Sequence, residues 1–220
     1  MTKRGLCFDL DGTLIDSGPG GLVQFCKVAK ILNLPMNEEI KAKIGTKWGQ
    51  YPANLIRTAW PDTDIGQFYK QWEDLDIANP WPVFPGTKEA LNTLDRYYYL
   101  SILTNRNLRT VAPQLAHNQL MEFFNFVATP ESSGSKKPDP KSMEPIFKWY
   151  QQIGISKYEI IIIGDTIEGD WKLAQDLGLE FYAVTSGGMD TKDEFQSAGV
   201  PGDHIIDSVA DLPHILLMNF

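Results

Sequence analysis

The chain has 220 residues, of which 43% are hydrophobic and 22% charged, and its formal net charge is −8. This size and composition are typical of a globular protein with one core, or with one core and a small second domain. The negative charge argues against nucleic acid or anionic lipid as a partner, because both repel an acidic surface.

The N-terminal region and the cysteines favour a cytoplasmic protein. The apolar run after Lys3 and Arg4 is much shorter than the hydrophobic segment of a signal peptide. No run of about 18 apolar residues suggests a membrane span. We interpret Cys7 and Cys26 as buried small hydrophobic residues rather than as a disulfide, which fits a reducing compartment.

The first predicted element is a buried strand, because GLCFDL at 5–10 is a short apolar run that ends in acidic residues. Similar apolar runs recur at 98–105, 159–165 and 180–186. Segments with helical spacing separate them, at 90–97, 143–150 and 171–177. This alternation predicts an α/β fold, with a Rossmann-like parallel sheet flanked by helices. In such sheets the ligand crevice lies at the carboxyl ends of the strands.

Residues 16–82 interrupt the alternation, because they contain no convincing strand. Their apolar residues follow helical spacing in three places, at 22–33, 55–59 and 68–75. Turn-rich segments flank the stretch, SGPGG at 17–21 and NPWPVFPG at 79–86, and we predict hinges there. We therefore expect a Rossmann-like catalytic core made of 1–15 and 83–220, and an inserted small α-helical cap domain at 16–82 that lies over the crevice.

The segment FDLDGT at 8–13 carries the central chemical signal. Asp9 and Asp11 lie two residues apart where the first strand ends, and Gly12 gives the backbone the freedom to turn. Two carboxylates so close repel each other unless a cation lies between them. Mg²⁺ suits oxygen ligands, so the pair predicts a magnesium site, with a solvated acidic turn as the alternative.

Two later segments add groups that can handle phosphate. SILTNR at 101–106 ends the second predicted strand with Thr104 and Asn105, whose hydroxyl and backbone amides could hold phosphate oxygens. SKKPDP at 135–140 places Lys137 before a proline, in an extended segment. A lysine there could neutralise both a carboxylate nucleophile and a phosphoryl group. Taken alone, ordinary turn residues and a solvent-facing lysine are the alternatives.

The segment IIIIGDTIEGD at 160–170 adds two more acids. Its four isoleucines predict a buried strand that delivers Asp165 to the same edge of the sheet, and Asp170 follows five residues later. Acids at the ends of two different buried strands are costly without a shared cation. The segment therefore strengthens the prediction of a metal site.

The four segments FDLDGT, LTN, KKPDP and GDTIEGD, in this order and with these intervals, resemble the motifs of the haloacid dehalogenase-like hydrolase superfamily. The resemblance covers the whole chain, and the insert at 16–82 looks like the helical type 1 cap of that superfamily. Within it the chain is most similar to phosphoglycolate-phosphatase-like enzymes. The second acid, Asp11, distinguishes it from haloacid dehalogenases, which lack that acid and need no metal.

The resemblance implies a role for each motif residue. Asp9 would be the nucleophile that forms an aspartyl-phosphate, and Asp11 would be the general acid and base. Lys137 would steady Asp9 and the phosphate. Thr104 and the Asn105 amide would bind the phosphoryl group. Asp9, the backbone carbonyl of Asp11 and Asp165 would bind Mg²⁺. Asp170 would bind the ion directly or through water.

The predicted cap would set substrate specificity. Lys47, in a predicted turn between cap helices, could pair with a substrate carboxylate or second phosphate, with a solvated lysine as the alternative. Core packing explains the tryptophans of this region better than substrate stacking does, and they are Trp48, Trp60, Trp72 and Trp81.

The resemblance implies a Mg²⁺-dependent phosphatase acting on a small phosphorylated metabolite, such as phosphoglycolate, and we expect a monomer. Two alternatives remain open at this point: a sugar phosphomutase similar to β-phosphoglucomutase, and a phosphate-binding protein of the same fold without turnover. Isomerised sugar phosphate without free phosphate would indicate the mutase.

Overall fold

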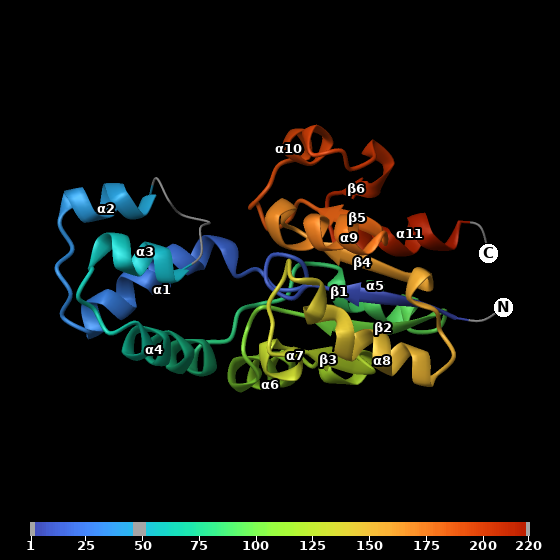
Figure 1. Cartoon of the computed structure of the whole chain (residues 1–220), viewed down its shortest axis with the longest axis horizontal. Helices are drawn as coiled ribbons and strands as arrows, with labels where there is room; N and C mark the ends of the chain where they lie inside the picture. The colour runs from blue at the N-terminus through green and yellow to red at the C-terminus, as the bar shows by residue number, and fades with distance from the viewer. Residues whose placement is uncertain (1–2, 46–51, 219–220) are drawn as a thin grey trace. The chain divides into compact units, whose positions relative to one another are not determined.

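The computed structural model describes residues 3–45 and 52–218, and it divides the chain into two compact units (Figure 1). One unit is Gly18–Pro80, and the segments before and after it together form the other. The larger unit contains a β-sheet and helices, and the smaller one is helical in its described residues. The two units are described separately below.

The larger unit is built on a six-stranded sheet in which every strand pair is parallel, in the order β3-β2-β1-β4-β5-β6. The strands are β1 (Arg4–Phe8), β2 (Tyr98–Leu103), β3 (Phe126–Ala128), β4 (Ile160–Gly164), β5 (Glu180–Val184) and β6 (Ile205–Ile206). The chain moves outward from β1 in one direction through β2 and β3, then returns to the other side of β1 for β4. The order therefore reverses between β1 and β4, where parallel sheets bind ligands.

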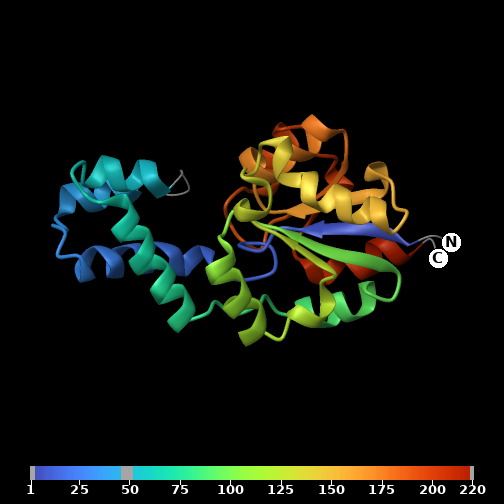
Figure 2. The ribbon, with the colours of Figure 1, turned by 60° about the horizontal axis from the view of Figure 1, so that its bottom comes forward.

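Helices cover both faces of this sheet (Figure 2). One face packs against α5 (Thr87–Leu94), α6 (Leu108–His117) and α11 (Leu212–Leu217). The other packs against α8 (Glu144–Gln152), α9 (Lys172–Leu177) and α10 (Lys192–Ser197). Both faces are covered, and the central strands are accordingly mostly apolar, with every residue of β4 buried. These findings confirm the predicted α/β class and parallel sheet.

The two chain segments that lead to and from Gly18–Pro80 run side by side in the larger unit. Ile15 pairs with Val83 in an antiparallel bridge, and the N–H of Asp16 donates to the carbonyl of Pro82 at 2.8 Å. Farther along, Gln114 of α6 and Asn118, which directly follows α6, both donate through their side-chain amides to the carbonyl of Trp81. The core thus holds both segments up to the boundary of the helical unit.

The smaller unit consists of α1 (Gly18–Ile31), α2 (Glu38–Gly45), α3 (Pro52–Ala59) and α4 (Ile65–Ala78), without a strand among its described residues. Phe25 and Phe68 are fully buried at its centre, with ring centroids 4.9 Å apart. Trp60 stacks on Phe25 and donates its indole N–H to the carbonyl of Pro35 at 2.8 Å. Packing of this kind is how a small helical unit obtains a core of its own.

Several local expectations differ from the structure. Strands β3 and β6 were not predicted, because three and two residues are too short for a periodic pattern. The predicted turn at 17–21 is helical from Gly18 onward, and a proline near a helix start is tolerated because its missing N–H has no partner there. Tyr97 lies beyond the end of α5 and is exposed, and Cys26 is only half-buried.

Candidate active site

The carboxyl ends of the three central strands bring the predicted site residues to one edge of the sheet. Asp9 follows β1, Thr104 follows β2 and Asp165 follows β4, and all three are buried. The N–H of Asp9 donates to the carbonyl of Ile163 at 2.8 Å, which continues the pairing of β1 with β4 past the end of the strand. The sheet itself therefore sets the spacing between Asp9 and Asp165.

A tight turn follows Asp9 and requires a glycine. Gly12 has a φ of 73°, a conformation that side chains with a Cβ rarely adopt. A Cβ at this position would also collide with the carboxylate of Asp165. A Cβ at Gly187, in the loop after β5, would lie 2.6 Å from the same carboxylate. The two glycines leave room around Asp165 that larger residues would fill.

Three acids and one lysine form the centre of the site. Asp9, Asp165 and Asp170 each place one carboxylate oxygen within 4.8 Å of the other two. The ammonium of Lys137 lies 2.6 Å from Oδ1 of Asp9 and 2.6 Å from Oδ1 of Asp170. This arrangement puts three negative charges against one positive charge in a buried place.

Lys137 is held by its backbone as well as by its ammonium. Its N–H donates to Oδ1 of Asn105 at 2.7 Å, and its carbonyl accepts from Nδ2 of Asn105 at 3.1 Å. Burial alone would lower the pKa of Lys137, but the charges of Asp170 and Asp9 outweigh it and raise that pKa above its ordinary value. The lysine is therefore a fixed, charged group.

Asp170 comes from a π-helical turn, Ile167–Trp171, that follows β4. Its Oδ1 accepts from Lys137, and its Oδ2 accepts from the hydroxyl of Thr166 at 2.6 Å and from the N–H of Thr166 at 3.2 Å. A Cβ at Gly164 would collide with this carboxylate. Both oxygens of Asp170 thus accept hydrogen bonds, Oδ1 from Lys137 and Oδ2 from Thr166, and direct metal binding by Asp170 stays a prediction.

Asp9 and Asp165 carry negative charge that the protein compensates only in part. Within residues 3–45 and 52–218, the one hydrogen bond to the Asp165 carboxylate comes from the hydroxyl of Thr13 and is long, 3.4 Å. Burial, followed by the charges of Asp9 and Asp170, raises the pKa of Asp165 well above its usual range. Burial raises the pKa of Asp9 to about 7 although Lys137 opposes the change. A cation between Asp9 and Asp165 would offset this cost, so these residues fit a hard divalent ion.

Asp11 is paired differently, with an arginine that the sequence interpretation did not use. Nε of Arg106 donates to Oδ2 of Asp11 at 3.0 Å, and Nη2 donates to Oδ1 at 2.5 Å. Burial by itself would raise the pKa of Asp11, but the charge and hydrogen bonds of Arg106 outweigh burial and lower it. Arg106 directly follows the LTN segment, and only its position in the sequence could have pointed to it.

Backbone groups at the same edge are available for an anion. The N–H groups of Leu10, Asp11 and Asn105 donate no hydrogen bond within the described part of the chain. The hydroxyl of Thr104 accepts from the N–H of Arg106 at 3.1 Å. The side chain of Asn105 pairs with the backbone of Lys137, and phosphate binding by the backbone N–H of Asn105 stays a prediction.

Lys47 and the tryptophans of the predicted cap have separate outcomes. Lys47 and Trp48 are outside the described residues. Trp60 and Trp72 pack in the core of the helical unit, and Trp81 packs against the core of the larger unit. Among the helices of residues 3–45 and 52–218, none has both the length and the apolar character that crossing a bilayer requires.

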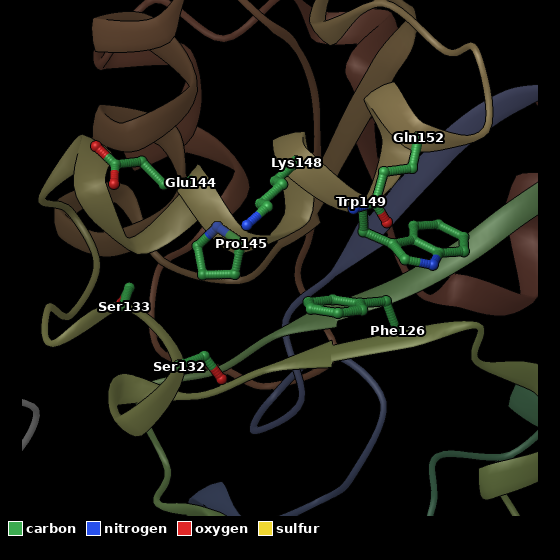
Figure 3. Close-up of a pocket in the computed structure, with 8 residues that line it drawn as sticks. All are labelled: Phe126, Ser132, Ser133, Glu144, Pro145, Lys148, Trp149 and Gln152. Carbon is green, nitrogen blue, oxygen red and sulfur yellow. The ribbon is translucent and has the colours of Figure 1, made fainter.

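A separate pocket lies on the surface of the larger unit, between α8 and the edge strand β3 (Figure 3). It has a volume of about 430 Å³, and Trp149 and Phe126 form part of its wall with stacked rings. Lys148, Glu144 and Gln152 lie at the same pocket. None of the lining residues belongs to the acidic cluster, so this pocket is distinct from the site described above.

Comparison with known proteins agrees with the geometry. A model of the haloacid dehalogenase-like hydrolase family matches residues 6–184. The phosphoglycolate phosphatase of Nitrosococcus oceani is 26% identical over 229 residues, which cover 96% of this chain and 95% of that protein. The phosphoglycolate phosphatase of Photorhabdus laumondii is 28% identical over 198 residues, which cover 84% of this chain and 81% of that protein.

Solved structures share the fold over nearly the whole chain. A HAD-hydrolase of Bacillus subtilis, YfnB, bound to magnesium, has a TM-score of 0.75 at 20% identity, covering 99% of this chain and 100% of that one. A predicted phosphoglycolate phosphatase of Haemophilus somnus has a TM-score of 0.77 at 24% identity, covering 98% and 99%. A family match over most of the chain, on a fold that these structures share, leads to one conclusion. The chain belongs to the haloacid dehalogenase-like hydrolase family.

Proposed function

We propose that this hydrolase is a Mg²⁺-dependent phosphatase that cleaves a small phosphorylated metabolite through an aspartyl-phosphate on Asp9. The observation that carries the proposal is the buried cluster of Asp9, Asp165 and Asp170 around the single ammonium of Lys137. The three carboxylates leave negative charge that a bound Mg²⁺ would neutralise. A phosphate ester adds further negative charge, which Lys137 and Mg²⁺ together would offset.

Asp9, Asp165 and the backbone carbonyl of Asp11 are the groups that would hold Mg²⁺. Asp165 fits this role because it is buried and has only a long hydrogen bond from Thr13 within the described residues. When bound, the ion supplies a positive charge that offsets the charge on the transferring phosphoryl group. Asp170 contributes to the site by accepting a hydrogen bond from the ammonium of Lys137.

Asp9 is the best candidate for the nucleophile, because Asp11 and Asp170 are held by other protein groups and Asp165 is proposed to bind Mg²⁺. Both oxygens of Asp170 accept hydrogen bonds from protein groups, and both oxygens of Asp11 accept from Arg106. Asp9 is held through Oδ1 by Lys137. In the first half-reaction an Asp9 oxygen attacks phosphorus, the bond from phosphorus to the leaving oxygen breaks, and Asp11 passes a proton to that oxygen.

The second half-reaction removes the phosphoryl group from Asp9. A water molecule attacks phosphorus, Asp11 accepts a proton from it, and the bond from phosphorus to Asp9 breaks, which releases phosphate and restores the carboxylate. The ion pair with Arg106 lowers the pKa of Asp11, which supports its role as the proton acceptor of this step. The N–H groups of Leu10, Asp11 and Asn105, which donate no hydrogen bond to any described residue, are suited to hold the phosphoryl oxygens in both steps.

The substrate class follows from the relatives rather than from the geometry. Proteins similar over most of this chain are named phosphoglycolate phosphatases, which makes phosphoglycolate the first substrate to test. We extend the proposal to residues 16–82 as a cap domain that sets this specificity, in which Lys47 binds a substrate carboxylate.

A phosphate-release assay tests the proposal. Phosphoglycolate, other small phosphate esters and 4-nitrophenyl phosphate are each incubated with the protein in Mg²⁺ or in EDTA, alongside Asp9→Asn. We expect release that requires Mg²⁺ and is lost in the variant. Isomerised sugar phosphate without free phosphate would indicate a mutase instead, and magnesium and phosphate binding without turnover would indicate a binding protein.

A further inference from the structure

The contact between Arg106 and Asp11 is more than a surface ion pair. The two N–H groups of Arg106 approach the two carboxylate oxygens separately, at 3.0 Å and 2.5 Å. The arginine side chain is only 10% exposed, whereas that of Asp11 is 36% exposed. The buried partner is therefore the cation, and the carboxylate keeps an open side toward solvent.

This geometry fixes the plane of the Asp11 carboxylate. Two parallel N–H···O bonds from a rigid guanidinium define both the position and the rotation of a carboxylate, which a single donor cannot do. The open side of Asp11 then faces a defined direction. Proton transfer to or from a bound group depends on such alignment, and a displacement of about 1 Å can cost about a hundredfold in rate.

Arg106 is itself held by two neighbouring elements. Its N–H donates to the hydroxyl of Thr104, directly after β2. The next residue, Asn107, caps helix α6 by accepting from the N–H of Thr110 at 3.3 Å. The backbone of Arg106 is thus fixed between the sheet edge and the start of a ten-residue helix. The side chain reaches Asp11 from a rigid base.

We propose that Arg106 is the positioning residue of Asp11, and that this contact serves the second half-reaction, in which Asp11 takes a proton from the water that hydrolyses the aspartyl-phosphate. The inference rests on the proposed function. A carboxylate whose two oxygens both accept from a guanidinium is presented as a proton acceptor. When the leaving group departs without a proton, forming the phosphoenzyme does not need Asp11, so this contact should matter little in that step.

The two half-reactions can be separated with 4-nitrophenyl phosphate, whose leaving group departs without a proton. Stopped-flow absorbance then reports formation of the phosphoenzyme as a burst of 4-nitrophenolate and its hydrolysis as the steady-state rate. For Arg106→Gln we expect a stoichiometric burst with a rate within about threefold of wild type. We expect the steady-state rate to fall about 10- to 100-fold, part of what general base catalysis typically contributes. Arg109→Gln, the same change at an exposed arginine three residues later, is the matched control and should leave both rates unchanged.

Two further variants make the test decisive. Arg106→Lys keeps the positive charge but loses the pair of parallel N–H donors. Its steady-state rate should therefore lie between those of wild type and Arg106→Gln. If Arg106→Gln melts below the assay temperature, Arg106→Lys is judged by the same separation of rates. In an Asp11→Asn background, Arg106→Gln should add less than about twofold, because a positioning residue has no effect once the group that it positions is gone.

The outcomes that would overturn the inference differ from those that would overturn the proposed function. A burst rate that falls as much as the steady-state rate would place Arg106 on the substrate or on Asp9. Unchanged rates in Arg106→Gln would show that Asp11 needs no such partner. Either result contradicts the positioning role while wild type still turns over. A wild-type protein that releases no product from any ester in Mg²⁺ contradicts the proposed function itself.

Discussion

The ammonium of Lys137 lies 2.6 Å from a carboxylate oxygen of Asp9. Both residues are buried. The side-chain amide of Asn105 forms hydrogen bonds with the backbone N–H and carbonyl of Lys137. The contact connects the end of β1 with a loop more than a hundred residues later in the chain. It makes the lysine both a structural partner of Asp9 and a candidate group for charge stabilisation in phosphoryl transfer.

Replacing Lys137 by Met should remove both contributions. Asp9 and Asp170 would lose their shared cation while staying buried, and breaking a buried ion pair in this way typically costs about 3–5 kcal/mol. We expect a lower free energy of unfolding in urea and a loss of phosphatase activity of at least about a hundredfold. Lys136→Met, at the adjacent exposed lysine, is the control and should change neither by much. Normal activity in Lys137→Met would contradict the role given to this lysine.

Asp165 and Asp170 should respond differently to neutralisation. Asp165→Asn removes a carboxylate that has little hydrogen bonding of its own, so we expect Mg²⁺ affinity to fall at least about tenfold. Asp170→Asn disturbs a residue whose oxygens are already engaged by Lys137 and Thr166, so turnover should fall more than Mg²⁺ affinity does. Calorimetric titration with Mg²⁺, combined with steady-state kinetics, separates the two effects. Equal losses of Mg²⁺ affinity would show that Asp170 binds the ion directly.

A methyl group at Gly187 should interfere with the metal site. The Cβ of Gly187→Ala would lie 2.5 Å from the carbonyl of Gly12 and 2.6 Å from Oδ2 of Asp165, so the backbone or the carboxylate must move. We expect weaker Mg²⁺ binding in the same titration. Gly188→Ala is a useful comparison, because it has nothing within 4 Å of its Cβ although its φ is 69°. That variant should lose about 1 kcal/mol of stability and keep its Mg²⁺ affinity.

Without metal, stability should decrease as the pH rises. The pKa of Asp9 is raised from an ordinary value of 3.8 to about 7, and that of Asp165 is also raised, so the folded protein binds more protons than the unfolded chain between about pH 4 and pH 7. The free energy of unfolding in EDTA should therefore fall across this window. Mg²⁺ should restore stability most strongly at the high end. Urea denaturation at several pH values measures how the free energy of unfolding changes with pH. Asp9→Asn should make this change smaller. A free energy of unfolding that rises with pH in EDTA would contradict the prediction.

The sequence predicts the parts of the fold that local patterns determine. Four of the six strands are five or six residues long and mostly apolar, whereas β3 and β6 are too short to have a pattern and form because neighbouring strands provide partners. Asp9 and Asp165 are predictable as site residues because acids directly after buried strands are costly and need a reason. The recognisable order of the four motifs then adds Lys137.

The contacts of Arg106 and Asn105 could not be predicted in the same way. Arg106 is one arginine in a loop, and only the folded sheet edge brings it to Asp11, 95 residues earlier. The amide of Asn105 pairs with the backbone of Lys137 across 32 residues, a role that no local spacing indicates. Such contacts depend on tertiary geometry, and they decide how the predicted catalytic groups are held.

The central claim is that Asp9 becomes phosphorylated, and chemical trapping of the intermediate tests it most directly. The protein is mixed with phosphoglycolate and Mg²⁺, quenched in acid within milliseconds and reduced with borohydride, which converts an aspartyl-phosphate to homoserine. Peptide mass spectrometry then locates the change. We predict homoserine at position 9 with Mg²⁺ and substrate, and none in EDTA. Phosphate release with an unmodified Asp9, or modification at a different carboxylate, would contradict the account.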